Sequence, residues 1–272
     1  MAIPTLVDYE NFLREFSDEL KPIRGVSFFI YGSHLREDFV PGVSDLDGFI
    51  VLDDFFVTDK NTIEKLASSL DSSLRKSNTN IKTQFNVFDK GIAHDGRFLA
   101  YSKSYVDSLK SNAVKKFGKY ELENMNGFDY KNPELTSIAN NLNDVRKGFL
   151  YNNFNYYSQK RDFYEKDMKS PLKKLTQLPK QLINLSTGIL FEDKDESFNE
   201  FLKEFPKYYD DSLVRRVNAL MKDPVKYESF WDGDGGFSFS LDCLGEMEKM
   251  IKIYTEKFPK VSNNEVKDNS FN

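Results

Sequence analysis

The pattern of apolar and polar positions changes along the chain. In the first hundred residues, short apolar runs of strand length alternate with segments whose apolar residues recur at helical spacing. The spacing predicts, in chain order, a helix over 5–20, strands over 25–30 and 46–52, a helix over 62–75 and a strand over 81–88. This order favours a small mixed sheet with helices packed on it.

After about residue 104 the strand signals nearly vanish, and helical periodicity takes over. It predicts helices over 134–166, 171–190, 195–204, 211–222 and 241–257. We therefore expect an α/β (α+β) domain over 1–103, followed by an all-helical bundle domain over 104–258. The polar end of the chain, 259–272, is expected to be disordered.

The composition is that of a soluble globular protein, with 30% charged and 15% aromatic residues in a chain of 272. No apolar run approaches the ~18 residues of a membrane span, and the N-terminus lacks the pattern of a signal peptide. The one cysteine, Cys243, excludes an internal disulfide and fits a reducing cytoplasm. The two histidines, His34 and His94, argue against a His-rich zinc site.

The segment with the most chemical content joins the first two predicted strands. A Gly32-Ser33 turn follows the first strand, and Asp45 and Asp47 stand at the head of the second. Side chains alternate along a strand, so both carboxylates point the same way. Such a pair holds Mg²⁺ and, through it, a nucleoside triphosphate. The turn can approach a phosphate closely, and Arg36 can add positive charge.

This arrangement resembles the nucleotidyltransferase superfamily related to DNA polymerase β, whose pattern is Gly-Ser, a loop, then Asp-x-Asp inside a strand. The resemblance implies that Asp45 and Asp47 bind the metal and carry the catalysis. It also implies that Gly32, Ser33 and Arg36 position the phosphates. The segment 188–197 and the helices after it resemble, more loosely, the C-terminal bundle of bacterial aminoglycoside nucleotidyltransferases. Those enzymes attach AMP to a drug hydroxyl.

A third carboxylate of this superfamily commonly stands on a neighbouring strand. By its setting in the strand 81–88, Gln84 occupies that position, so we expect it to offer a carbonyl oxygen to the metal without acting as a base. Asp89 is the nearest acid but falls on the opposite face by parity, and it is not expected to be the base. Asn155 stands where some aminoglycoside enzymes place their base. Two alternatives follow for the general base. Either it is an acid that the sequence does not place, with Asp162, Glu165 and Glu192 as candidates, or the acceptor loses its proton to bulk water.

The sequence therefore predicts a Mg²⁺-dependent transfer of a nucleoside monophosphate, AMP, to a hydroxyl of a small acceptor. The net charge of −5 and the lack of a continuous basic stripe favour a small acceptor, neutral or cationic, over a nucleic acid. The resemblance of the helical half implies that this acceptor is an aminoglycoside-type antibiotic. Acidic residues that could receive a cationic drug are Glu192, Asp193, Asp195, Glu196, Asp232 and Asp234. Two alternatives stay open: nucleotidylation of a protein or tRNA, and a binding module that has lost its activity.

Overall fold

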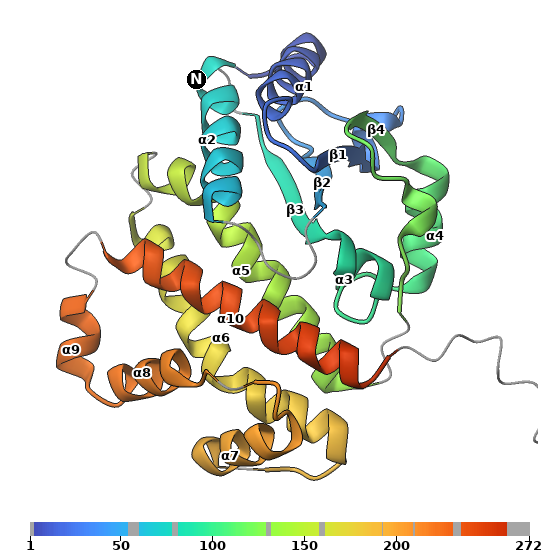
Figure 1. Cartoon of the computed structure of the whole chain (residues 1–272). Coiled ribbons are helices and arrows are strands. Elements are labelled where there is room, and N and C mark those ends of the chain that lie inside the picture. The colour runs from blue at the N-terminus through green and yellow to red at the C-terminus, as the bar shows by residue number, and fades with distance from the viewer. Residues whose placement is uncertain are drawn as a thin grey trace, which may run out of the picture.

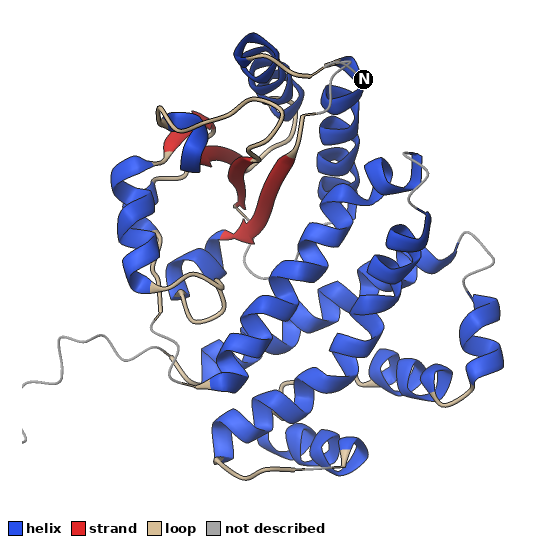
Figure 2. Cartoon of the chain, turned by 180° about the vertical axis from the view of Figure 1, so that it is seen from behind, coloured by secondary structure: helices blue, strands red, loops and turns tan. Residues whose placement is uncertain are grey.

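A four-stranded sheet lies at one end of the molecule, and long helices make up the rest (Figures 1 and 2). This computed structural model describes residues 3–53, 60–77, 81–128, 132–157, 161–191, 193–208, 210–230 and 235–259. The strands are β1 (Val26–Tyr31), β2 (Leu46–Leu52), β3 (Thr83–Asp89) and β4 (Val114–Phe117), in the order β3-β2-β1-β4. β1 runs antiparallel to β2 and β4, whereas β2 and β3 are parallel, so the sheet is mixed as predicted.

Two helices, α1 (Leu6–Leu20) and α2 (Lys60–Lys76), cover one face of this sheet. Thr5 and Asp8 form a capping box that starts α1. The apolar stripe of α1 then packs on the strands: the Phe16 ring lies 5.1 Å from that of Phe28 and 5.6 Å from that of Phe85, between ring centroids. This aromatic core fixes the strands that carry the predicted site.

The opposite face of the sheet continues into the helical part without a break in the buried core. Phe29, Phe49 and Phe88 belong to the same hydrophobic cluster as residues of the long helices. The elements that follow β3 are α3 (Lys90–Asp95), α4 (Lys103–Asn112), η2 (Leu122–Asn124), α5 (Pro133–Tyr157), α6 (Arg161–Thr187), α7 (Lys194–Glu204), α8 (Ser212–Met221), α9 (Pro224–Ser229) and α10 (Gly235–Lys257). β4 therefore joins the sheet from beyond the boundary expected at residue 104.

The long helices differ from the predicted ones in where they begin and end. The helix predicted over 134–166 ends at Tyr157, and α6 begins at Arg161 and runs through Pro171 and Pro179. A proline inside a helix removes one backbone hydrogen bond. The apolar stripe of α6 is almost fully buried (Met168, Leu172, Leu175, Leu178 and Leu182). This burial outweighs the cost of the two prolines.

The helix α5 lies against β3, which is an edge strand of the sheet in the described part of the chain. The Tyr151 hydroxyl accepts a hydrogen bond from the Phe85 backbone N–H at 2.9 Å and lies 3.0 Å from the Thr83 hydroxyl. A side chain of α5 thus satisfies a donor of β3 that a fifth strand would otherwise use.

A buried ionic triad joins β3 to α5 and α10. The Arg146 guanidinium donates to Glu248 from Nε at 2.8 Å and from Nη2 at 2.6 Å, and it also binds Asp89. No side chain of the three is more than 1% exposed. A second oxygen of Asp89 accepts the Ile92 N–H at 2.8 Å and caps α3.

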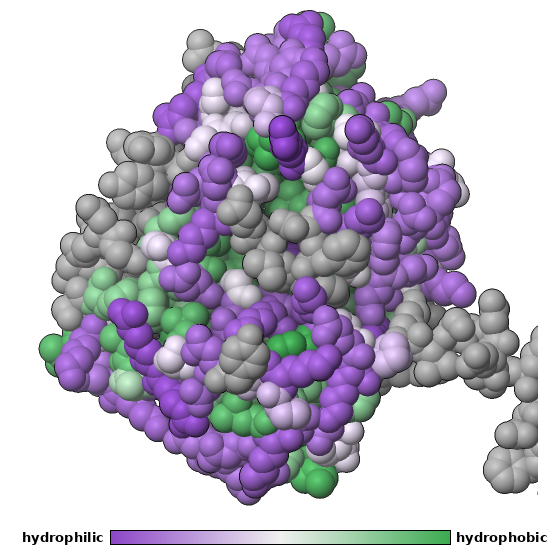
Figure 3. Space-filling model, viewed as in Figure 1, coloured by the Kyte–Doolittle hydropathy of each residue, from purple (hydrophilic) through white to green (hydrophobic). Residues whose placement is uncertain are grey.

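The predicted fold class, a small mixed sheet with helices followed by a helical part, is confirmed. In the view of Figure 3, hydrophobic side chains reach the surface mainly over the helical part. Within the described residues, every helix falls short of the length or the hydrophobicity that a membrane span requires.

Candidate functional site

The two aspartates lie where the sequence places them, at the start of β2. Leu46 is fully buried, whereas Asp45 is exposed and Asp47 is half-buried. The strand register pairs Asp47 with Tyr31 of β1 on one side and with Gln84 of β3 on the other. Paired residues of neighbouring strands share a face. The exposed Gln84 side chain therefore lies on the same face of the sheet as the Asp47 carboxylate, the face that also carries Phe49 and Phe88.

The Gly-Ser turn touches this carboxylate directly. Gly32 begins a short 3₁₀ helix, η1 (Gly32–Leu35), with φ +82°, a left-handed conformation that favours glycine. A Cβ added at Gly32 would lie only 2.5 Å from Oδ2 of Asp47. Only a glycine therefore allows the turn and the carboxylate to come this close. The structure thus brings together the two halves of the predicted motif, which lie fifteen residues apart in the sequence (Gly32 to Asp47).

The charges around Asp47 oppose one another. Burial, and next the charge of Asp45, raise the pKa of the Asp47 carboxyl above its ordinary value, while Lys147 and Arg36 pull it down. Arg36 is exposed and also forms an ion pair with Asp38 at 2.9 Å. A cation between the two carboxylates would relieve their repulsion. The pair thus fits a divalent metal by its chemistry.

Lys147 of α5 is a site residue that the sequence analysis missed. Burial lowers the pKa of its ammonium group, while the charges of Asp144, Asp47 and Asp45 raise it. Its half-buried charge, facing both predicted catalytic aspartates, suits a phosphate. The signal in the sequence is weak, because a lysine in a long helix is ordinary until that helix is known to lie near the two aspartates.

Three tyrosines lie on the other side of Asp47. Tyr31 ends β1, Tyr101 precedes α4 and Tyr105 lies in its first turn. The Tyr31 and Tyr101 hydroxyl oxygens are 3.3 Å apart, and the buried Asn86 amide donates to Tyr101 at 2.7 Å. The Asp47 charge contributes to raising the pKa of Tyr101 and Tyr105, after burial as the main cause. These hydroxyls are therefore neutral donors, not bases.

Other predicted candidates do not join this group. The Asp89 carboxylate binds the Arg146 guanidinium and caps the start of α3, so it is not free to act as the base, as expected. The side chain of Asn155 lies outside the described residues, as do Glu192, Asp232 and Asp234 and the side chains of Asp162 and Glu165. Within the described part of the chain, no three His, Cys, Asp or Glu side chains gather closely enough to hold a metal.

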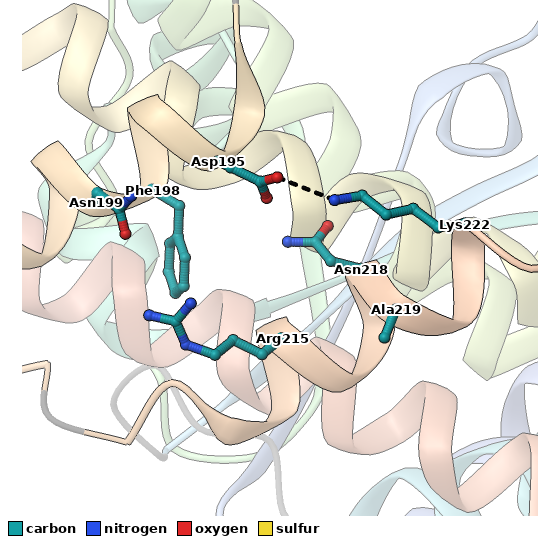
Figure 4. A pocket seen from close by; sticks show the side chains of 7 residues that line it. All are labelled: Asp195, Phe198, Asn199, Arg215, Asn218, Ala219 and Lys222. Atoms are coloured by element: carbon teal, nitrogen blue, oxygen red, sulfur yellow. Dashed lines mark hydrogen bonds and ion pairs between the residues drawn. The ribbon is translucent and has the colours of Figure 1, made fainter.

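A separate pocket of about 420 Å³ lies between α7 and α8 (Figure 4). It is lined by Asp195, Phe198, Asn199, Arg215, Asn218, Ala219 and Lys222. Its charged groups bind each other or their neighbours: Lys222 pairs with Asp195 at 2.9 Å, and Arg215 pairs with Asp211 at 2.6 Å and lies over the Phe198 ring. The pocket contains none of the residues predicted for catalysis.

The comparisons with known proteins agree with the geometry of the sheet. Residues 10–90, which span β1 to β3 and both aspartates, match the family described as "Nucleotidyltransferase domain". This part of the chain is a nucleotidyltransferase domain of the superfamily related to DNA polymerase β, and the protein is a nucleotidyltransferase.

The match to single proteins is more distant. No curated protein matches the sequence. Among solved structures, the chain is similar to spectinomycin adenyltransferase AAD(9) from Enterococcus faecialis, solved with ATP and spectinomycin. The two share 14% identity over 90% of this chain and 100% of the other, with a TM-score of 0.31. A likeness at this level does not bear on the substrate.

Proposed function

We propose that this nucleotidyltransferase moves AMP from ATP to a hydroxyl of a small, ammonium-bearing acceptor of the aminoglycoside type, with Mg²⁺ as the metal. The observation that carries the proposal is the contact between Gly32 and Asp47, with Asp45 beside them. It combines a close-approach turn for phosphates with two hard oxygen ligands. The family match of residues 10–90 supports nucleotidyl transfer in general, and the acceptor is the part that we add.

The roles follow from these positions. Asp45 and Asp47 would hold Mg²⁺, with Gln84 offering an amide oxygen from the neighbouring strand. When bound, the metal supplies charge that offsets the negative charge of the α-phosphate and of the departing pyrophosphate. Gly32 and Ser33 would cradle the outer phosphates through backbone N–H groups and the serine hydroxyl.

Cations from two segments would complete the triphosphate site. Lys147 approaches the aspartates from α5, and Arg36 approaches Asp47 from the loop after η1. Both can neutralise phosphate oxygens as the transferring group develops charge. The half-buried Lys147 should contribute more than the exposed Arg36, because water screens an exposed charge.

The acceptor hydroxyl must lose a proton during transfer. Apart from Asp45, which we assign to the metal, and Arg36, the described side chains around Asp47 are an amide, a lysine and neutral tyrosines, none of which is a carboxylate free to act as base. We therefore propose that the proton passes to solvent and that catalysis rests on positioning and on charge stabilisation.

One assay tests the proposal directly. The protein is incubated with Mg²⁺, each labelled nucleoside triphosphate in turn and a panel of aminoglycosides, lincosamides, tRNA and cell lysate. We expect label from ATP to move to an aminoglycoside, and the doubly substituted protein Asp45→Asn, Asp47→Asn to lose this transfer by at least ~10²-fold. Label on a macromolecule and on no drug would reject the acceptor, and transfer by the doubly substituted protein would reject the metal ligands.

The role of Gln84 has its own test. Two carboxylates and an amide hold a reluctantly dehydrated ion weakly. We expect no Mg²⁺ binding by calorimetry without nucleotide at sub-millimolar metal, and clear binding of ATP with Mg²⁺. Gln84→Glu should leave nucleotide binding nearly unchanged, and it should raise transfer only if a base is lacking. Tight Mg²⁺ binding by the unsubstituted protein would show that another acid completes the site.

A further inference from the structure

The three tyrosines beside Asp47 form a built aromatic wall, which we call the tyrosine wall (Tyr31, Tyr101 and Tyr105). The Tyr105 ring lies edge-to-face against the other two, with centroids 4.9 Å from Tyr101 and 6.1 Å from Tyr31. Tyr105 is 40% exposed, whereas the other two are more buried. The wall therefore presents Tyr105 to a ligand and supports it from behind.

Two further features of the surrounding residues hold the tyrosine rings in this arrangement. Ala100, directly before Tyr101, has φ +64°, and it is the one non-glycine residue with positive φ in the described part of the chain. Such strain persists only where the surroundings over-determine it, and it concentrates at functional sites. Asn86, only 6% exposed in the strand β3, donates its amide hydrogen bond to the Tyr101 hydroxyl. A core polar group is thus used to orient a ring of the wall.

The strand register places the wall relative to the phosphates. Gly32 and Ser33 follow the end of β1, so they lie beyond the row that contains Tyr31 and Asp47. Tyr101 instead contacts Asn86 and the Phe88 ring, which stand further along the sheet, away from the turn. Asp47 therefore has the phosphate turn on one side and the tyrosine wall on the other.

The chemistry of phosphoryl transfer then assigns the wall to one substrate. The attacking oxygen enters roughly in line with the bond that breaks, opposite the departing pyrophosphate. If the pyrophosphate leaves on the side of Gly32 and Ser33, the acceptor approaches from the side of the wall. There it meets the aromatic rings of the wall, whose faces attract an ammonium group.

We propose that the tyrosine wall binds the acceptor, with the exposed Tyr105 ring recognising an ammonium group by a cation–π contact. This inference rests on the proposed function, because it takes the phosphate side of Asp47 from it. It makes Tyr105 a specificity-determining residue for cationic acceptors.

The test compares Tyr105→Phe, which keeps the ring, with Tyr105→Leu, which removes it. Kanamycin serves as the cationic probe, and N-acetylated kanamycin keeps the skeleton without the charges. Binding of each is measured by calorimetry in the presence of Mg²⁺ and a non-hydrolysable ATP analogue, and pyrophosphate release gives KM for kanamycin and for ATP. We expect Tyr105→Leu to weaken kanamycin binding between about two- and thirty-fold, Tyr105→Phe to stay close to the unsubstituted protein, and KM for ATP to be unchanged.

Several results would overturn the inference. The first is that the unsubstituted protein does not bind kanamycin, and the second is that both variants lose kanamycin affinity equally. The third is that acetylated kanamycin binds as tightly as kanamycin. The fourth is that Tyr105→Leu changes KM for ATP instead, which would place the nucleobase on the wall. The two proposals fail separately. Ring-dependent binding of kanamycin without AMP transfer would refute the proposed function and keep the wall, whereas transfer that ignores Tyr105 would do the reverse.

Discussion

Replacing Arg146 by methionine should destabilise the protein severely, because it removes the guanidinium charge that binds two buried carboxylates. The triad side chains are at most 1% exposed, and the guanidinium bridges the carboxylates of Asp89 and Glu248. Removing one partner of a buried ion pair costs about 3–5 kcal/mol. For a chain of this size we expect the midpoint of thermal unfolding to fall by roughly 6–20 °C.

The assay is urea unfolding followed by far-UV circular dichroism, with the m value checked for constancy. An exposed ion pair gives the matched control: Arg215→Met breaks the pair with Asp211 and should cost under about 1 kcal/mol. A triple variant, Arg146→Met with Asp89→Asn and Glu248→Leu, removes every charge and keeps an acceptor at the cap of α3, so most of the loss should be recovered.

Two outcomes would refute this reasoning. If Arg146→Met costs no more than Arg215→Met, the triad is not desolvated as the structure has it. If the triple variant is no more stable than the single one, the loss arises from packing volume and not from uncompensated charge.

Three further predictions concern the site. Asp47→Asn should lower transfer by at least ~10²-fold yet raise the midpoint of thermal unfolding at pH 7. Because folding raises the pKa of the Asp47 carboxyl, its ionisation makes the folded state less stable as pH rises. The gain in thermal stability from the substitution should therefore vanish as pH falls below the ordinary pKa range of an aspartate. Lys147→Gln should raise KM for MgATP about tenfold or more, and Lys147→Arg should retain part of the affinity, as steady-state kinetics would show. Gly32→Ala should lower both transfer and thermal stability, because the new Cβ meets the Asp47 carboxylate in a left-handed conformation; an active, equally stable variant would contradict the close contact.

The sequence predicts the parts of the site that depend on short stretches of chain. Asp45 and Asp47 share a face because of strand alternation, and Gly32 and Ser33 form a turn because an apolar strand ends there. Gln84 could also be placed, because β2 and β3 are both clear apolar runs whose register follows from their buried faces.

The remaining parts depend on packing between segments that are far apart. Lys147 and Tyr105 lie in helices, and nothing local indicates that these helices border Asp47. β4 was missed because its four residues, Val114–Phe117, are mostly exposed and include two lysines, so no buried run marks it. Asp89 looks like a free acid in the sequence, since its partner Arg146 comes from a distant helix.

The hydrogen bond from the Phe85 N–H to Tyr151 has a consequence for how the protein behaves among other copies of itself. A sheet edge with free backbone groups is a template for strand addition and aggregation. Tyr151 occupies one such donor on β3, and exposed Lys115 and Lys116 stand on β4 at the other edge. Both edges of the sheet are therefore protected against strand addition, the β3 edge by a helix and the β4 edge by charged side chains. Any event that separates α5 from β3 would expose this donor again and make the β3 edge available for strand addition.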